Sequence, residues 1–127
     1  MMGQTSGIEK SVKCTAAITI ANTIAKFGAD DDTLSLATAS TEELIGVFQH
    51  ITSAANEEVR VMLSGVSLVK LGGTVVRGGW ITTDGSGQGV AAAPGAGVNV
   101  AVIGKALASG VLGDLIPAFL APGRIQG

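Results

Sequence analysis

The side chains that most often carry out covalent chemistry are scarce in this chain, which has one thiol, Cys14, and one imidazole, His50. Nucleophilic catalysis needs a nucleophile beside a base that a third group orients, so an enzyme hypothesis would have to pair Cys14 with His50. Both residues fall in strand-like segments, where either side chain also fits a core or surface position. One cysteine and one histidine cannot form a multi-thiolate zinc site, and we expect no metal and no cofactor.

Three acidic clusters could suggest a cation site or glycoside chemistry. Residues 30–32 are consecutive aspartates, and residues 42–43 and 57–58 are adjacent glutamate pairs. A calcium loop needs alternating acidic positions around a central glycine, and a glycosidase needs opposed carboxylates. Adjacent carboxylates cannot all face one ion, so we interpret residues 30–32 as a solvated loop and the glutamate pairs as turns.

A glycine-rich run over residues 85–89, Gly-Ser-Gly-Gln-Gly, has the composition of a phosphate-binding loop. Its spacing is G-x-G-x-G, no helical pattern follows, and the later Gly104-Lys105 precedes Ala106 where a P-loop requires Ser or Thr. Thr83-Asp84 and this run instead predict a tight hairpin turn, because Gly and Asp tolerate positive φ.

The composition favours binding to other proteins over catalysis. The chain has 127 residues, enough for one domain, and only 14% are charged, against roughly 25% in an average globular protein. A net charge of -2 with isolated basic residues leaves no footprint for nucleic acid. The longest uncharged stretch, residues 85–104, contains six glycines and does not predict a membrane span. The first residues show no secretory-signal pattern, so we expect synthesis in a cytoplasm.

Short apolar segments bounded by Gly, Asp, Asn and Ser predict a mainly β protein. Residues 33–37 are the clearest strand, with Leu34 and Leu36 on one face. Residues 1–25 predict an extended N-terminal arm, with 13–25 alternatively a strand, ahead of a β-rich domain over residues 26–127. The other expected strands are residues 44–51, 58–63, 66–71, 80–83, 89–93, 98–107 and 114–120.

Part of the sequence repeats with an offset of 58 residues: Ile45-Gly46 reappears as Ile103-Gly104, and Gly65 as Gly123. In the same register three further pairs align, Asn56 with Asp114, Val61 with Phe119 and Met62 with Leu120. Chance matching among common residues is one explanation. The other, which we favour, is a pair of related β-hairpins that close into a small β-barrel or β-sandwich, since a solenoid needs three or more copies.

Five glycine-bounded segments carry a family resemblance: residues 43–47, 56–65, 78–87, 102–107 and 113–116, with residues 119–123 fitting the same pattern. In this order and spacing they resemble the capsid cement, or head decoration, proteins of tailed bacteriophages. Members of that family are small β-rich proteins that sit on the outer face of an assembled head, commonly as trimers. They clamp neighbouring major capsid subunits and have no catalytic residues.

The resemblance implies a structural capsid protein and not an enzyme. Its partners would be the major capsid protein and further copies of itself in a homotrimer, with neither nucleic acid nor membrane involved. It would lie on the outer surface of the virion after synthesis in the cytoplasm of a bacterial host. The alternative is a small-ligand or carbohydrate-binding β-module on a virion surface, in which the single indole, Trp80, would stack on a sugar ring.

We expect the capsid or subunit contacts to lie mainly in the N-terminal arm. A polar arm that orders on a partner spreads its contacts over a wide surface, and many copies add through multivalency. A small domain with few aromatic residues also gains stability from burial against identical copies. The candidate contact residues are Thr5, Ile8, Val12, Thr15, Ile18, Ile20 and Trp80.

Overall fold

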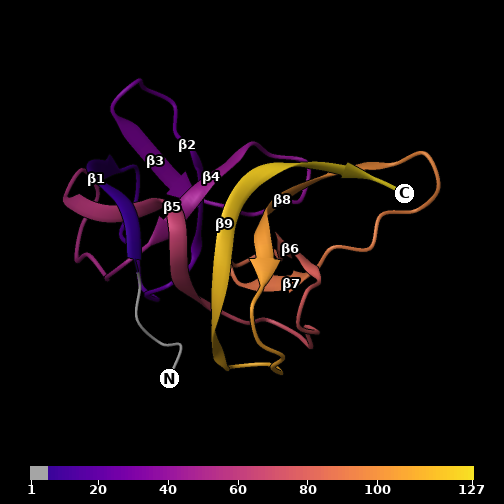
Figure 1. Cartoon of the computed structure of the whole chain (residues 1–127). Helices are drawn as coiled ribbons and strands as arrows, with labels where there is room; N and C mark the ends of the chain where they lie inside the picture. Colours follow the sequence, from indigo (N-terminus) through magenta and orange to yellow (C-terminus); the bar gives the residue numbers. More distant parts are fainter. Residues whose placement is uncertain (1–5) are drawn as a thin grey trace.

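A computed structural model describes residues 6–127, which form nine β-strands and no helix. The strands are β1 (Ser6–Cys14), β2 (Ile24–Phe27), β3 (Thr33–Leu36), β4 (Leu44–Phe48), β5 (Glu58–Lys70), β6 (Trp80–Thr83), β7 (Gly89–Ala91), β8 (Asn99–Ala106) and β9 (Leu115–Gln126). They join in one sheet in the order β1-β3-β2-β4-β5-β9-β8-β6-β7 (Figure 1). Within the described residues, no helix is long and apolar enough to cross a membrane.

Strand β1 closes part of this sheet into a barrel, because it pairs with β3 on one side and with β5 on the other. The strands β1-β3-β2-β4-β5 therefore form a closed five-stranded barrel with no free edge between them. The predicted fold class, a mainly β protein with a small barrel, is confirmed.

The N-terminal segment belongs to this barrel. β1 runs antiparallel along β5 from Ser6↔Val66 to Lys13↔Glu58, and its end meets β3 in parallel at Cys14↔Leu34. The expected boundary between residues 25 and 26 falls inside β2. Residues 6–14 are therefore a wall of the barrel rather than an arm that extends away from it.

Most expected strands match the structure, and the largest difference is in β5. Residues 80–83 form β6 as predicted, and the hairpin turn that follows is confirmed: Asp84 Oδ1 accepts hydrogen bonds from the N–H groups of Ser86 and Gln88, at 2.8 and 3.0 Å. The two strands expected at 58–63 and 66–71 are one 13-residue strand that continues through Gly65.

The nine strands form two similar units that share β5. We define unit 1 as residues 6–63, with the strand order β1-β3-β2-β4-β5, and unit 2 as residues 64–121. In unit 2 the second half of β5 takes the place of β1, and the order is β5-β7-β6-β8-β9. The parallel pair Cys14↔Leu34 joins β1 to β3, and the parallel bridge Leu71↔Gly89 joins β5 to β7 in the same way.

The backbone hydrogen bonds of the two units correspond pair by pair. The N–H of Cys14 donates to the Glu57 carbonyl at 3.0 Å, and the N–H of Leu71 donates to the Asp114 carbonyl at 2.8 Å. Three further bonds from a backbone N–H to a carbonyl oxygen occur in both units. In unit 1 they run from Asn22 to Phe48, from Asn56 to Cys14 and from Thr52 to Ile18. In unit 2 the matching bonds run from Gly78 to Ala106, from Gly113 to Leu71 and from Gly110 to Val75. Positive φ recurs at the same places, at Asn22 and Gly78 and at Asn56 and Gly113.

The repeat is thus larger than the two predicted hairpins, and part of its predicted register is one residue out. The offset is 58 between β4 and β8, as Ile45-Gly46 and Ile103-Gly104 indicated. It is 57 between the first halves of β5 and β9, because the connection from Ala106 to its partner Ala118 is one residue shorter than that from Phe48 to its partner Val61. Phe119 therefore corresponds to Met62 and not to Val61.

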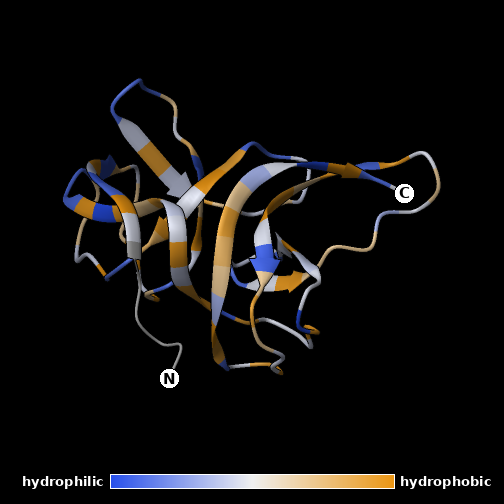
Figure 2. Cartoon of the chain, in the orientation of Figure 1, coloured by the Kyte–Doolittle hydropathy of each residue, from blue (hydrophilic) through white to orange (hydrophobic). Residues whose placement is uncertain are grey.

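Two clusters of buried side chains form the core. One fills the interior of unit 1 and consists of Cys14, Ile18, Ala25, Leu34, Phe48, Val59 and Val61. The other joins the interior of unit 2 to the contact between the units, and its members from unit 1 are Ile24, Ala37, Leu44, Val47 and Met62. Apolar bands along β3, β5 and β9 mark the strand positions that supply these side chains (Figure 2).

Candidate interaction surfaces

Cys14 and His50 have separate hydrogen-bond partners. The buried Cys14 Sγ lies 3.4 Å from Thr52 Oγ1 and 3.4 Å from the Glu57 carbonyl oxygen. His50 Nε2 accepts a hydrogen bond from the N–H of Arg60 at 3.1 Å, and its Nδ1 lies 3.0 Å from the Ile51 carbonyl oxygen. The structure therefore gives each group a local structural role and does not present them as a nucleophile with its base.

The acidic residues stabilise turns. Glu42 caps the turn that follows β3: its carboxylate accepts hydrogen bonds from the N–H groups of Thr38 and Ala39 and pairs with Lys26 Nζ at 2.5 Å. Burial by itself would raise the pKa of Glu42, but the bonds from Lys26 and from the backbone outweigh it and lower the pKa from 4.5 to about 2. Hydrogen bonds from Ser53 likewise lower the pKa of Glu57.

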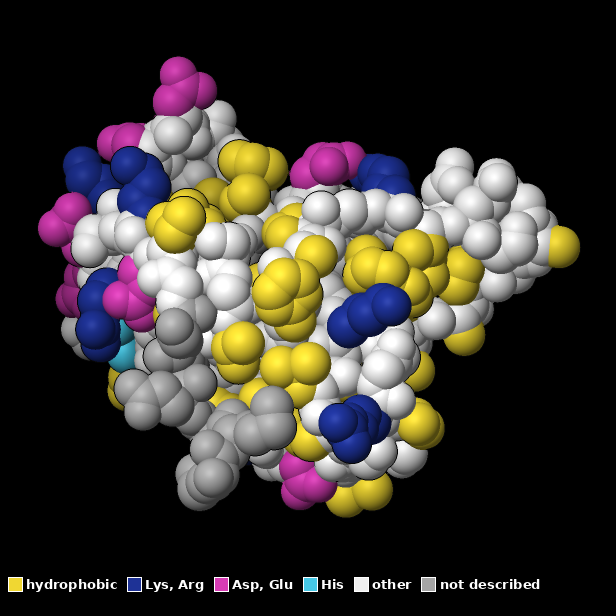
Figure 3. All heavy atoms as spheres, viewed as in Figure 1, with side chains coloured by type: hydrophobic (Ala, Val, Ile, Leu, Met, Phe, Trp, Pro, Cys, Tyr) yellow, Lys and Arg dark blue, Asp and Glu magenta, His cyan; other side chains and the backbone are white. Residues whose placement is uncertain are grey.

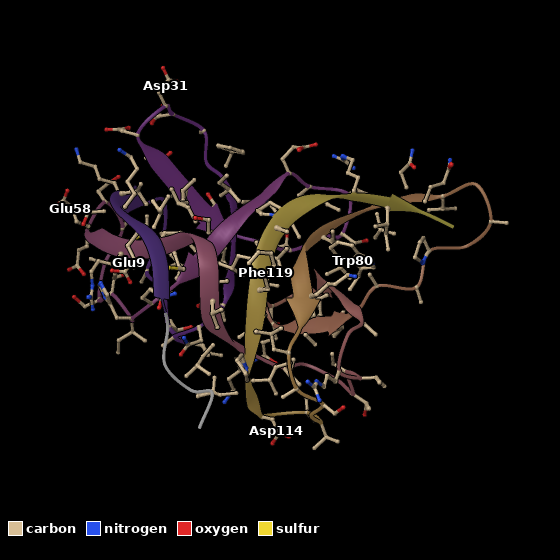
Figure 4. The ribbon with its side chains drawn as sticks, in the orientation of Figure 1. Glu9, Asp31, Glu58, Trp80, Asp114 and Phe119 are labelled. Atoms are coloured by element: carbon tan, nitrogen blue, oxygen red, sulfur yellow. The ribbon has the colours of Figure 1, made fainter. Side chains whose placement is uncertain are left out.

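No group of three His, Cys, Asp or Glu side chains within residues 6–127 is arranged to hold a metal ion. The aspartates at 30–32 lie in the β2–β3 turn, where Asp31 projects from the tip (Figure 4). The same turn is closed by the Asp30 carbonyl, which accepts a hydrogen bond from the N–H of Thr33 at 3.2 Å.

The predicted contact residues of the N-terminal segment do not share one surface. Thr5 lies outside the described residues. Ile8, on β1, is 65% exposed, and Ile18 is 2% exposed in the interior of unit 1, so its side chain has no free surface to offer. The others differ as well: Val12 is partly buried, Thr15 is exposed and hydrogen-bonded to Ser35, and Ile20 lines a hollow beside Ser86.

Trp80, the remaining predicted residue, belongs to a row of three outward-facing side chains across unit 2. The register pairs Trp80 with Lys105 and Lys105 with Phe119, so β6, β8 and β9 each contribute one residue. The Lys105 Nζ lies 4.8 Å from the centre of the Trp80 ring, where it makes a cation–π contact and occupies one face of the indole. Phe119 is 51% exposed (Figure 4).

The row continues onto β5 as an apolar surface. Val66 pairs with Phe119 across the β5–β9 ladder, and Leu68 pairs with Pro117 two residues further on. At the end of the ladder Leu115 is 50% exposed opposite Lys70. Apolar side chains consequently gather over β9, β8 and β6, with basic side chains among them (Figure 3). Contiguous apolar surface of this kind is typical of protein contacts.

Unit 1 has a second, smaller apolar surface at a groove of about 220 Å³. Its apolar lining includes Val12, Ile45 and Leu63, which pack against the interior of unit 1 and are only partly buried. Phe27 also lines it and is 58% exposed. The charged residues in the lining are Lys10, Asp31 and Asp32.

The charges divide between the units. Unit 1 has eight carboxylates and four basic side chains, a formal charge of -4. Unit 2 has two carboxylates and three basic side chains, a formal charge of +1, and Arg124 lies beyond it. The groove is therefore on the acidic unit, and the row of Trp80, Lys105 and Phe119 is on the basic one.

Sequence reasoning singled out Trp80 but missed Lys105 and Phe119. The constant offset of 58 aligned Phe119 with Val61, which points into the interior of unit 1. Leu115 and Phe119 are four residues apart on one strand, and the period of two along a strand is the signal that could have placed both on the same outer face.

No protein-family model matches the sequence, and no curated protein sequence matches it. The fold does recur among solved structures. The crystal structure of the head fiber gp8.5 N base of bacteriophage phi29 superposes with a TM-score of 0.68, over 94% of this chain and 98% of that chain, at 16% sequence identity. At this identity the match establishes a shared fold.

Proposed function

We propose that this chain is a structural protein of a bacteriophage head, which binds the outer surface of the assembled capsid and stabilises contacts between major capsid subunits. The observation that carries the proposal is the fold match to a phage head fiber base over almost the full length of both chains. The resemblance of residues 43–123 to capsid cement proteins supports it independently, because it rests on sequence motifs.

The surface is suited to adhesion. Ten large apolar side chains among the described residues are substantially exposed, and Leu112, Val76 and Ile8 are each at least 65% exposed. Each described carboxylate, and the imidazole of His50, accepts a hydrogen bond from the backbone, pairs with a basic side chain or faces solvent. We therefore propose no enzymatic role. Self-association into a homotrimer is part of the proposal, since many copies bound side by side strengthen individually weak contacts.

A decoration assay tests this function. Expanded heads of the phage that encodes the chain, prepared without the protein, are mixed with purified protein, pelleted, and then heated or diluted osmotically. We expect the protein to co-sediment with the heads and to raise the temperature at which they release DNA. Absence of co-sedimentation at any protein concentration would refute the proposal.

A variant at the N-terminal strand then asks whether β1 contacts the capsid. Deleting β1 would remove a wall of the barrel, so the substitution Ile8→Asp is preferable: Ile8 is largely exposed, and the barrel remains closed. The matched control is Ile51→Asp, which is 60% exposed in the loop after β4. Weaker head binding by Ile8→Asp alone would assign β1 to the capsid contact. Equal head binding by the two variants would show that β1 is not part of that contact.

A further inference from the structure

The two units contact each other through surfaces that are not equivalent. Unit 1 contributes the row Ile24, Val47 and Met62, which the register places side by side on β2, β4 and β5. These side chains are at most 2% exposed and share one cluster with the side chains of unit 2, and β4 lies against β8 and β9. The contact is thus head-to-tail: an outer row of one unit meets a different surface of the next.

Unit 2 contributes Val69, Ile103 and Leu120 to the same cluster, and they are 0 to 3% exposed. Val69 stands two residues before Leu71, as Val12 stands two residues before Cys14 in the matching strand. The counterparts of Val69, Ile103 and Leu120 in unit 1 are therefore Val12, Ile45 and Leu63. These are the apolar side chains that line the groove on unit 1.

A head-to-tail pair leaves one copy of each surface uncovered. On unit 1 the uncovered surface is the groove. On unit 2 it is the outer row: Trp80, Lys105 and Phe119 occupy the register positions of Ile24, Val47 and Met62. Within residues 6–127 nothing buries this second row, since Phe119 is 51% exposed and Lys105 is exposed.

We infer that a second copy of this chain occupies the groove, by seating its row of Trp80, Lys105 and Phe119 against Val12, Ile45 and Leu63 of the first. The contact between copies would repeat the contact between the units. Repeat proteins join successive units through one recurring interface, and their end units expose apolar surface unless something covers it. A second copy is therefore the occupant that the contact between the units favours.

The two uncovered surfaces have formal charges of opposite sign. Lys105 stands where unit 1 has Val47, so the free row is positively charged. The groove is lined by Asp31 and Asp32 with Lys10 as the one basic residue, so its formal charge is negative. Such complementarity favours one relative orientation of two copies and disfavours contact of like surfaces.

A contact between two different surfaces produces a closed ring or an open filament. This inference deepens the proposed function and rests on the self-association proposed there, because a ring of three copies would be the homotrimer. It does not require capsid binding. Its test uses the purified full chain alone, so self-association and head binding can fail separately.

The test is a mixing experiment followed by analytical ultracentrifugation. Wild-type protein is expected to associate across a concentration series. Phe119→Asp removes the row, and Phe27→Asp places a carboxylate in the groove, so each variant alone is expected to be monomeric. Mixed in equal amounts, the two variants are expected to form a 1:1 heterodimer, because one keeps an intact groove and the other an intact row.

Lys105→Glu is the second variant, since an exposed charge reversal leaves the core untouched and keeps the test valid if Phe119→Asp does not fold. It is expected to weaken association about tenfold or more, because it places like charges together. Leu112→Asp, 70% exposed in the turn before β9, is the control and is expected to associate like wild type.

Three results would overturn the inference: wild-type protein that stays monomeric at every concentration, a mixture of folded variants that stays monomeric, or an equal loss of association in Leu112→Asp. If wild type is monomeric and Phe119→Asp no longer binds heads, the row contacts the capsid instead. In that case the proposed function stands and the contact between copies does not.

Discussion

Unit 1 and unit 2 share their strand order, their turn positions and their backbone hydrogen bonds, yet they fill their interiors with different side chains. Phe48 of unit 1 corresponds to Ala106 of unit 2, and Ala25 corresponds to Ile81. Leu34 corresponds to Gly89, where a Cβ would lie 2.9 Å from Val69 and 3.0 Å from Ile81. Where one unit has a smaller interior side chain, a neighbouring strand of the same unit has a larger one. The shared strand arrangement is thus specified by backbone features, and different sets of apolar side chains can fill the interior as long as their total volume is kept.

The units differ more on their outer surfaces. The row of Ile24, Val47 and Met62 is apolar and buried, whereas the corresponding row of Trp80, Lys105 and Phe119 contains a charge and lies open. The same register thus supports a core contact in one unit and a candidate binding surface in the other.

The comparison predicts that the aromatic ring in unit 1 carries a large share of the stability of its interior. Phe48 is fully buried, and its counterpart in unit 2 is the much smaller Ala106. Phe48→Ala is expected to lower the free energy of unfolding by about 3–5 kcal/mol, measured by urea denaturation. Leu112→Ala, on an exposed turn, is the control and should change it by less than about 0.5 kcal/mol. A loss below about 1 kcal/mol for Phe48→Ala would show that the interior is loosely packed.

The close approach of β8 to β9 should tolerate no side chain. A Cβ on Gly104 would lie 2.0 Å from the Phe119 carbonyl oxygen, and a Cβ on its counterpart Gly46 would lie 2.5 Å from the Met62 carbonyl oxygen. Gly104→Ala is expected to cost about 3 kcal/mol and Gly46→Ala somewhat less, by thermal or chemical unfolding. Gly123→Ala, with no neighbour nearer than 3.9 Å, is the matched control. Equal stability of Gly104→Ala and Gly123→Ala would contradict the matched geometry of the units.

The cap formed by Glu42 exists only in unit 1, and it should make unit 1 sensitive to acid. Because the pKa of Glu42 falls from 4.5 unfolded to about 2 folded, its contribution is complete above about pH 4.5 and is lost as the pH falls towards 2. Glu42→Gln is expected to cost about 1–2 kcal/mol at pH 7, and the difference from wild type should shrink across that window. A difference that is constant from pH 7 to pH 2 would rule out the ionised cap.

The smallest expected effect concerns the left-handed turn that both units use before the last strand. Gly113 has φ +90° with no atom near its missing Cβ, and Asn56 has φ +67° at the matching position. Gly113→Ala and Asn56→Ala are each expected to cost about 1 kcal/mol from backbone strain alone, whereas Asn56→Gly should be nearly neutral. Gly95→Ala serves as the control for Gly113→Ala. Unequal costs in the two units would show that the turns are not equivalent.

The sequence was enough to predict a mainly β barrel, the β6–β7 hairpin and the existence of an internal repeat, because alternation and turn residues act locally. The full duplication was hidden because loop lengths change the offset between 55 and 58 residues, so β2 and β3 do not align with β6 and β7 at one constant offset. Residues 6–14 were predicted to be an arm because their polar sequence does not indicate that they pair with β5 over most of their length. The row on unit 2 joins three strands distant in sequence, and no local pattern brings Trp80, Lys105 and Phe119 together.

The shared strand has a consequence for how the molecule melts. Glu58–Lys70 is the last strand of unit 1 at its start and the first strand of unit 2 at its end, and the two units share one buried cluster, so neither unit keeps its packing once the other has opened. Heating should therefore give one calorimetric transition with equal calorimetric and van't Hoff enthalpies, although the chain contains two similar units. For the same reason, cutting the chain between residues 63 and 64 should yield two fragments that are both unable to fold alone.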